Sequence, residues 1–409
     1  MRKILIINLL LVIVFNVFTN SFASEINLMQ KVKYEKTCET YLKYQGDLKT
    51  AHYAYYEENG KINPAYCLNP EFYGVSEERK EYAVNINGKI NNEKIWKVLI
   101  NGYPYKSIKE LGVESKEEAY TATQFAVYTV LHNRNINDYE SIGTEAGDRT
   151  LKAYKKIMEN AINFNEKITD KIEIALEEEW KIEKDEINIL SKTYSIKSNA
   201  KNGTYKVNLK DEKNNELKII DLSGNEKEEF LLNEPFKILV PISCLQEEQN
   251  LKIEINSTLM TKPIMYGEST IENTQNYALV GKEYEEFFVS YTEVLPKNNT
   301  KLKIIKQEFN SNKKIEGVKF NLLSTSNDMI FQNLITDKNG EINLENVLPG
   351  TYFLQEVETK DEYELIEEPI EINIEFEEQK EIVVENSLKP VEVKAEIKET
   401  QKILPVTGY

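Results

Sequence analysis

Short segments that alternate apolar and polar residues are the feature that most restricts the fold of this chain. From about residue 187 onward these segments follow one another between clusters of turn-forming residues, as at 205–209, 236–240 and 251–255. Alternation with a period of two predicts half-buried strands, which bury their apolar faces when one sheet packs on another. The sequence therefore predicts β-sandwiches over this part of the chain.

Helical signals interrupt the chain before residue 187. Ser115 and Glu118 have the spacing of a capping box, and apolar residues recur with helical periodicity after them. Further helices are predicted at about 150–163 and near 167–179, whereas the Tyr-rich segments before Ser115 are predicted to be irregular. Residues 24–296 are therefore predicted to form one α+β domain, a β-sandwich with a helical insertion.

A turn-rich break at 295–300 marks the main predicted domain boundary. After it, residues 297–388 contain several short strands separated by turn signals, among them 336–340 and 348–350, which predicts a second, all-β sandwich. The residues from Asp337 to Gly340 could begin a calcium loop, but the later ligand positions are missing. A hairpin turn is predicted there instead.

The N-terminus has the pattern of an export signal. Arg2 and Lys3 precede an apolar run over 4–18, and small residues precede Ser24. The run is too short for a spanning helix, so residues 1–23 are predicted to be a cleaved signal peptide and the chain to be secreted. Its removal takes the formal net charge from -17 to -19. This balance argues against nucleic acid as a partner, because phosphate binding needs clustered Lys and Arg.

The cysteine count limits the disulfides that an exported chain of this kind can form. The chain has three cysteines, Cys38, Cys67 and Cys244, so at least one thiol is free or otherwise engaged. A disulfide between Cys38 and Cys67 is one alternative. The two histidines and the lack of Cys-x-x-Cys or His-Glu-x-x-His predict no metal site, and without a glycine-rich phosphate loop no cofactor is predicted.

Three predicted strands of the second domain each place one polar residue on an apolar face. An unpaired charge in a sandwich is costly, so one interpretation puts these residues at strand ends that reach solvent. In the other, burial lowers the pKa of the lysine and raises that of the glutamate, and the neutral amine attacks a polarised carboxamide to form an isopeptide bond with loss of ammonia. The three faces are Leu302, Ile304 and Lys306; Tyr352, Leu354 and Glu356; and Ile382, Val384 and Asn386.

The second domain resembles the collagen-adhesin B-type repeat, also called the prealbumin-like or SpaA-type domain of Gram-positive surface proteins and pilins. The resemblance rests on segments 317–320 and 336–340, on 348–352 followed by Glu356, and on the final Asn386. It implies an all-β, immunoglobulin-like or prealbumin-like sandwich. It also implies that Lys306 and Asn386 are the crosslinked pair and that Glu356 is the proton shuttle.

Three segments of the first domain resemble the thioester domains of Gram-positive adhesins. They are an aromatic-Cys-apolar segment at 66–68, a Thr-Gln-x-Ala-apolar-aromatic segment at 123–128 and a Gln-x-x-apolar-apolar segment at 275–279. The resemblance implies an internal thioester between Cys67 and Gln275, an electrophile held ready for an outside amine.

The same resemblance assigns residues around the bond. Gln124 is expected on the helix behind it, and Tyr66, Thr123, Gln124 and Tyr128 are expected to wall the site. Tyr128 stands where the family usually has Trp, so the aromatic character of the wall is retained. Such a wall is expected to exclude water until the amine of a partner docks.

The C-terminus resembles a sortase sorting motif, in which a transpeptidase cuts after the threonine and joins it to a cell-wall amine. The motif consists of Leu404, Pro405, Thr407 and Gly408, and the charged, Pro-containing stretch that starts at residue 389 has the composition of an extended linker. Residues 389–409 are therefore expected to anchor the chain to peptidoglycan or to a pilus subunit. Such motifs are normally followed by an apolar span, so the sequence is expected to be truncated after this one.

The predicted function is that of a cell-wall-anchored, single-turnover covalent adhesin of a Gram-positive bacterium. Its expected partner is an amine of a host-surface or extracellular-matrix protein. One alternative is a structural pilin or stalk protein that binds non-covalently. A second is a cysteine enzyme that uses Cys67 with His52 or His132, although neither histidine lies in a recognisable catalytic motif.

Overall fold

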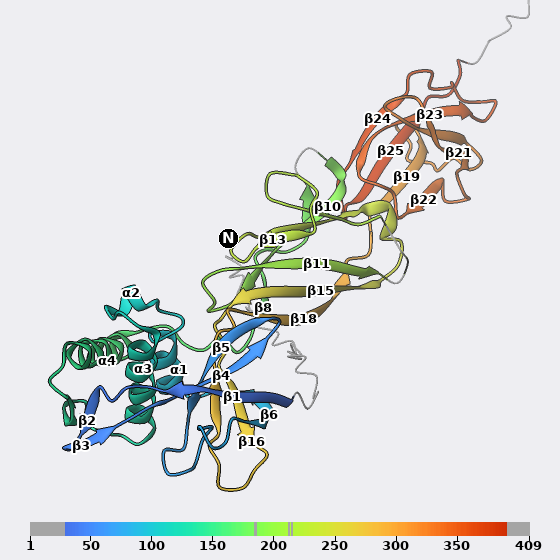
Figure 1. Cartoon of the computed structure of the whole chain (residues 1–409). Coiled ribbons are helices and arrows are strands. Elements are labelled where there is room, and N and C mark those ends of the chain that lie inside the picture. The colour runs from blue at the N-terminus through green and yellow to red at the C-terminus, as the bar shows by residue number, and fades with distance from the viewer. Residues whose placement is uncertain (1–28, 184–185, 212, 214–215, 391–409) are drawn as a thin grey trace, which may run out of the picture.

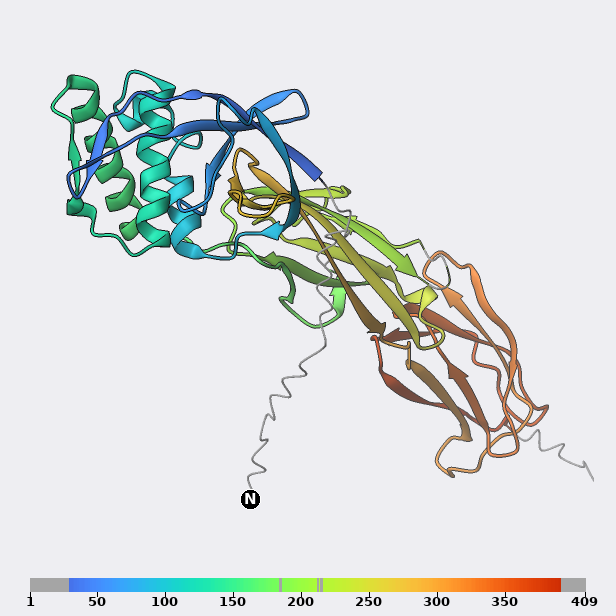
Figure 2. The ribbon, with the colours of Figure 1, turned by 60° about the horizontal axis from the view of Figure 1, so that its bottom comes forward.

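In the computed structural model the described residues are 29–183, 186–211, 213 and 216–390. The predicted signal peptide and the sorting motif lie outside them, as does the linker beyond residue 390. The described chain forms an elongated row of three bodies (Figures 1 and 2): a helix-containing unit, a middle sandwich and a C-terminal sandwich. Each has its own hydrophobic core. No helix within these ranges is long and apolar enough to cross a membrane.

The helix-containing unit is built on a closed barrel of six strands, in the order β1-β4-β5-β17-β16-β6. The prediction of irregular structure for the Tyr-rich segments was wrong. Tyrosine favours strands, and Tyr53, Tyr56 and Tyr66 lie buried on β4 and β5, with their rings in the core. The barrel strands are β1 (Met29–Thr37), β4 (His52–Glu58), β5 (Lys61–Cys67), β6 (Glu81–Lys89), β16 (Met265–Ser269) and β17 (Tyr277–Leu279).

Four helices and a small sheet cover one end of this barrel (Figure 1). The sheet has the order β3-β2-β7. The helices predicted after Ser115 and at about 150–163 are confirmed as α3 and α4. These elements are α1 (Glu93–Ile100), α2 (Ile108–Leu111), α3 (Lys116–Leu131), α4 (Glu145–Asn163), the 3-10 turn η1 (Ile136–Asp138), β2 (Leu42–Tyr44), β3 (Asp47–Lys49) and β7 (Tyr139–Ser141).

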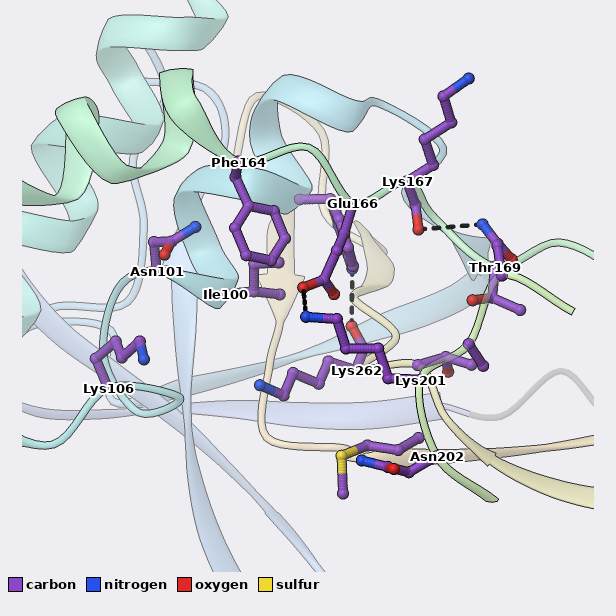
Figure 3. Close-up of a pocket in the computed structure, with 15 residues that line it drawn as sticks. Ile100, Asn101, Lys106, Phe164, Glu166, Lys167, Thr169, Lys201, Asn202 and Lys262 are labelled. Carbon is purple, nitrogen blue, oxygen red and sulfur yellow. Dashed lines mark hydrogen bonds and ion pairs between the residues drawn. The ribbon is translucent and has the colours of Figure 1, made fainter. Parts of the chain in front are cut away.

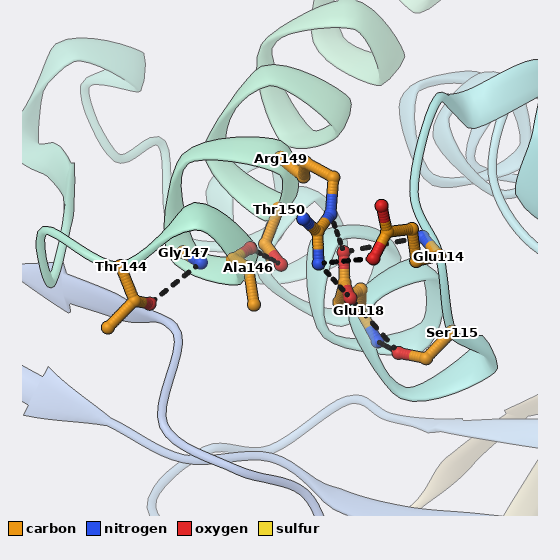
Figure 4. A network of polar contacts seen from close by, with 8 residues as sticks. All are labelled: Glu114, Ser115, Glu118, Thr144, Ala146, Gly147, Arg149 and Thr150. Atoms are coloured by element: carbon orange, nitrogen blue, oxygen red, sulfur yellow. Dashed lines mark hydrogen bonds and ion pairs between the residues drawn. The ribbon is translucent and has the colours of Figure 1, made fainter.

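Polar contacts fix α3 against α4, as Figure 4 shows. Ser115 Oγ caps α3 by accepting a hydrogen bond from Glu118 N at 3.1 Å. The Glu118 carboxylate, which is buried, accepts two hydrogen bonds from Arg149 of α4, from Nε at 3.0 Å and from Nη2 at 3.1 Å. Thr144 caps α4 in the same way. A bidentate pair of this kind fixes the orientation of both helices.

Most of the middle sandwich is inserted between α4 and the last two barrel strands, and its final strand, β18, follows them. Its sheets have the orders β12-β14-β10-β8, with β9 on β10, and β13-β11-β15-β18. The helix predicted near 167–179 was wrong, because Ile172 and Ile174 alternate with polar residues and pack into this core. The elements are β8 (Glu173–Leu176), β9 (Lys181–Glu183), β10 (Glu186–Lys197), β11 (Gly203–Asp211), β12 (Lys218–Ile220), β13 (Glu229–Leu231), β14 (Phe236–Pro241), η2 (Ile242–Cys244), β15 (Gln249–Met260) and β18 (Tyr284–Leu295).

A cavity of about 290 Å³ lies where the helix-containing unit meets the middle sandwich (Figure 3). Trp96 Nε1 of α1 donates to Lys262 O at 3.1 Å, and Glu166, after α4, forms an ion pair with Lys201 of the sandwich. These contacts join the two bodies through polar groups.

The C-terminal sandwich packs a β22-β19-β25 sheet against a β21-β20-β23-β24 sheet. The predicted fold class is confirmed. A turn is present at 336–340, where Asp337 Oδ1 accepts from the backbone N–H groups of Asn339 and Glu341, at 2.9 and 2.8 Å. The hairpin predicted there was wrong, because the turn leads from β21 in one sheet to β22 in the other. The strands are β19 (Lys301–Glu308), β20 (Lys319–Ser324), β21 (Met329–Ile335), β22 (Glu341–Glu345), β23 (Gly350–Glu358), β24 (Ile370–Ile374) and β25 (Gln379–Asn386).

Candidate functional site

Cys67 and Gln275 meet at one end of the barrel. Cys67 is the last residue of β5, and β17 pairs with β5 so that Tyr277 lies opposite Cys67. Gln275 therefore stands just before the paired segment. Both residues line one cavity of about 550 Å³. A Cβ atom placed on Gly74 would lie 3.2 Å from Gln275 Cγ and 3.7 Å from Cys67 Sγ, so the two side chains are neighbours.

The backbone of the loop after β5 holds the Gln275 carboxamide. Its Oε1 accepts a hydrogen bond from Asn69 N at 2.8 Å, and its Nε2 donates to Phe72 O at 2.8 Å. The side chain is buried. A backbone N–H on the carboxamide oxygen stabilises the negative charge that develops there when a nucleophile attacks the carbon. The carboxamide is thus both oriented and polarised.

Gln124 of α3 fixes the backbone of Cys67. Its Oε1 accepts from Cys67 N at 2.8 Å and its Nε2 donates to Cys67 O at 2.9 Å. Gln124 is buried, so loss of either hydrogen bond would leave a buried polar group without its partner. The Glu118–Arg149 pair holds the same helix (Figure 4), so the position of Cys67 depends on the packing of α3 against α4.

The Cys67 thiol lies in a desolvated setting. Burial raises the pKa of Cys67 to about 11, and hydrogen bonds with the Tyr277 and Tyr128 hydroxyls oppose that rise. The thiol is therefore protonated at neutral pH. Cys38 is a separate, buried free thiol, which contradicts the alternative of a Cys38–Cys67 disulfide.

A second cluster lies between the sheets of the C-terminal sandwich. Lys306, Glu356 and Asn386 are 0%, 5% and 1% exposed, which contradicts the interpretation that they reach solvent at strand ends. Lys306 Nζ lies 3.1 Å from Glu356 Oε2 and also contacts Asn386 Oδ1. Asn386 Nδ2 donates to Glu356 Oε1 at 2.8 Å and to Thr359 Oγ1 at 3.0 Å.

The strand arrangement explains how this cluster assembles. Lys306 and Asn386 lie on the neighbouring parallel strands β19 and β25, whereas Glu356 reaches across from β23 of the facing sheet. Burial lowers the pKa of Lys306, against the opposing effect of the Glu356 charge. The lowered pKa favours the neutral amine, which is the nucleophilic form.

Comparison with known families assigns two segments of the chain. A thioester-domain model matches residues 64–163, and a SpaA prealbumin-like fold model matches residues 300–388. The chain contains a thioester domain and a prealbumin-like domain. The thioester model includes Cys67 and Gln124, and strand pairing brings Gln275 to them from outside the matched range.

Solved structures of low sequence identity are similar to this chain, and the first of them supports the fold. The Bacillus anthracis TIE protein is 22% identical, with a TM-score of 0.55, and the match covers 88% of this chain and 66% of that one, just under two thirds of its length. The thioester domain of the Enterococcus faecium TIE86 protein is 20% identical (TM-score 0.48; 66% and 97% covered). BcpA, the major pilin subunit of Bacillus cereus, is 13% identical (TM-score 0.29; 54% and 71% covered). No curated protein matches the sequence significantly.

Two of the four predicted wall residues of the thioester domain do not line its cavity. Tyr128 and Gln124 line it, but Tyr66 and Thr123 do not. Neighbours on a strand point to opposite faces, so Tyr66 points away from Cys67 and stacks on Tyr120, with ring centroids 4.8 Å apart. Thr123 Oγ1 instead accepts from Tyr103 N at 3.0 Å and so supports the loop after α1.

Several residues of the thioester-domain cavity were missed from the sequence. Most of them lie in loops, others lie on the short strands β2 and β3, and none belongs to a recognisable motif. His52 lines the cavity, where its Nδ1 lies 3.0 Å from Thr37 Oγ1 and partial burial lowers its pKa. His132, the C-cap of α3, is not part of the lining. The missed lining residues include Tyr44, Phe72, Tyr73, Gly74 and Arg134.

Proposed function

We propose that this protein is a secreted, cell-wall-anchored adhesin of a Gram-positive bacterium that attaches covalently to an amine of a host-surface or extracellular-matrix protein. The observation that supports the proposal most strongly is the fixed Gln275 carboxamide, held by Asn69 N–H and Phe72 C=O in the cavity that also contains Cys67. These contacts orient and polarise the Gln275 carboxamide for attack by one nucleophile, the Cys67 sulfur.

The proposed bond joins Cys67 Sγ to Gln275 Cδ. The sulfur attacks the carbon, and the Asn69 N–H stabilises the negative charge on Oε1. The thiol proton passes to the departing nitrogen, the C–N bond breaks and ammonia leaves. Desolvation keeps the free thiol protonated, so the attack depends on the polarised carboxamide and on close placement rather than on a standing thiolate.

Reaction with the target reverses the roles of the groups. A neutral amine of the target attacks Gln275 Cδ, the C–S bond breaks, and Cys67 recovers a proton as a thiol. Tyr277 and Tyr128, whose hydroxyls hydrogen-bond with the thiol, stabilise the departing sulfur. The product is an amide to the target, and because the thioester is consumed, each molecule reacts once.

The C-terminal sandwich is proposed as a braced stalk. The neutral Lys306 amine attacks Asn386 Cγ, Glu356 relays a proton to the leaving nitrogen, ammonia departs, and an amide joins β19 to β25. The contacts of Glu356 with both Lys306 and Asn386 support this role for it. In the proposed chain order, residues 24–296 form the reactive head, 297–388 the stalk and 389–409 the anchor that sortase cuts after Thr407.

Incorporation of biotin-cadaverine tests the covalent head directly. The unmodified chain should become labelled, with the label on the Gln275 peptide in mass spectrometry. Cys67→Ala should give no label, whereas the matched control Cys38→Ala removes another buried thiol outside the cavity and should leave labelling intact. Labelling of Cys67→Ala to the extent of the unmodified chain would reject the thioester, and with it the covalent mechanism.

A further inference from the structure

Arg134 places a positive charge in the cavity that holds Cys67 and Gln275. It lies in the loop after α3 and is half-buried. Its guanidinium carbon lies 4.7 Å from the ring centroid of Tyr44 and 5.6 Å from that of Tyr128. Its Nη1 donates to the Tyr139 hydroxyl at 2.8 Å. Two stacked rings and one hydrogen bond therefore hold the charge in place.

This cation has no carboxylate within ion-pair distance among the residues that the structure describes. The other charged groups of the cavity lining balance one another, because Lys49 Nζ lies 3.5 Å from Asp47 Oδ2. Asp138, near Arg134 in sequence, accepts a hydrogen bond from Gln45 instead. The cavity thus carries one uncompensated positive charge, in a chain whose formal net charge is -17.

The charge lies close to the reacting sulfur. Tyr128, on whose ring the guanidinium rests, also hydrogen-bonds with the Cys67 thiol. One aromatic side chain therefore separates Arg134 from the atom that an incoming amine displaces. A group that pairs with Arg134 would hold the rest of its molecule over the thioester, and a planar guanidinium pairs best with a carboxylate.

We propose that Arg134 binds a carboxylate beside the reacting amine, so that the preferred target is a lysine with an adjacent acidic residue. This inference rests on the proposed thioester. The acidic surface repels acidic targets at long range, and Arg134 supplies a short-range attraction at the reaction site alone. A target lysine with basic or neutral neighbours would not be attracted by Arg134 in this way.

Two peptides that differ by one charge test this selectivity. Acetyl-Glu-Lys-amide and acetyl-Gln-Lys-amide each add through the lysine amine, and the measured quantity is the ratio of their second-order rates of mass gain. The unmodified chain should favour the Glu peptide roughly tenfold at low salt, as expected for one charge-assisted contact worth about 1.4 kcal/mol. The preference should shrink in 0.5 M salt, because an exposed pair is screened.

Arg134→Gln should bring this ratio close to one, whereas Arg134→Lys should keep part of it. The matched control Lys97→Gln removes a paired cation outside the cavity and should keep the full ratio. Equal rates for the two peptides on the unmodified chain, or a preference that survives both high salt and Arg134→Gln, would overturn the inference. Failure of methylamine to add to the unmodified chain would instead overturn the proposed thioester on which it depends.

Discussion

At the scale of single residues, the site depends on groups that align one bond rather than on a strong nucleophile. The pKa of Cys67 is raised, so its reactivity must come from placement. Gln124 fixes the sulfur-bearing residue, and Asn69 and Phe72 fix the carboxamide. Motif similarity indicated Cys67, Gln124 and Gln275. It did not indicate Asn69 or Phe72. These residues act through backbone N–H and C=O groups, which a side-chain motif does not reveal.

Gln124→Ala should reduce thioester formation. The substitution leaves the N–H and C=O of Cys67 without partners and should cost about 1–3 kcal/mol of stability. We expect a smaller fraction of molecules to have lost the ammonia of the head, as measured by the mass of the Cys67 and Gln275 peptides. Lys116→Ala, at an exposed position of the same helix, is the control. A full ammonia loss in Gln124→Ala would show that the clamp is dispensable.

When the Lys306 crosslink cannot form, the stability of the C-terminal sandwich should depend on pH. In Asn386→Ala the amine stays free, and its folded-state pKa lies below the ordinary value of 10.5. The unfolded chain then binds more protons than the folded chain between these two pKa values, so stability should rise with pH through that window. Thermal melts from pH 7 upward should show the rise in Asn386→Ala but not in Lys306→Met combined with Asn386→Ala. The same pH slope in both variants would contradict the pKa direction.

At the scale of elements, each sandwich connects its two sheets through buried polar groups. In the C-terminal sandwich these are Lys306, Glu356 and Asn386. In the middle sandwich Lys192 of β10 pairs with Glu293 of β18, and Trp180 Nε1 donates to the same carboxylate at 3.1 Å. Only the first cluster contains a carboxamide beside the amine, so only that sandwich is expected to lose ammonia.

The effects of Asn386→Ala and Glu293→Ala should therefore differ. Asn386→Ala removes a crosslink that closes a separation of 80 residues, so stability should fall by about 4.5 kcal/mol by the chain-entropy argument used for disulfides, and one ammonia loss should disappear. Glu293→Ala leaves the buried Lys192 charge without its partner. It should lower stability by about 3–5 kcal/mol without changing the number of ammonia losses. Melting and intact mass are measured together, and an altered number of losses in Glu293→Ala would contradict this division of roles.

Sequence periodicity was informative for these elements only where one face is buried. It predicted the sandwich strands, α3, α4 and the shared face of Lys306 with its apolar neighbours. It did not predict the barrel, because β5 and β17 pair across an inserted sandwich and local patterns contain no information on such distant pairing. The resemblance assigned Tyr66 to the wall of the site, but Tyr66 and Cys67 are neighbours on β5 and so face opposite sides of it.

At the scale of the whole molecule, the two proposed covalent sites lie in different bodies of an elongated chain (Figure 2). The Cys67–Gln275 site belongs to the body with the helices and the Lys306–Asn386 site to the C-terminal sandwich, with the middle sandwich between them. This order suits attachment under load. The head would bond once to its target, and the brace between β19 and β25 would resist unfolding of the stalk when force is applied.

Because the two proposed covalent sites lie in different bodies, a substitution at one should leave the reaction at the other unchanged. Lys306→Ala should lower the melting temperature and the protease resistance of the stalk while biotin-cadaverine still labels Gln275 at the rate of the unmodified chain. The reason is that no contact joins the two clusters, and distant sites contribute additively. Limited proteolysis and labelling are followed on one sample. A melting temperature equal to that of the unmodified chain would count against the brace.

The intact mass of residues 24–388, before and after methylamine, tests the central claim most directly. Each internal bond removes one ammonia, roughly 17 Da. We predict a deficit of two ammonias, followed by the addition of one methylamine at Gln275 with release of a free thiol at Cys67. A deficit of a single ammonia that methylamine leaves unchanged would contradict the thioester and leave a crosslinked stalk with a non-covalent head.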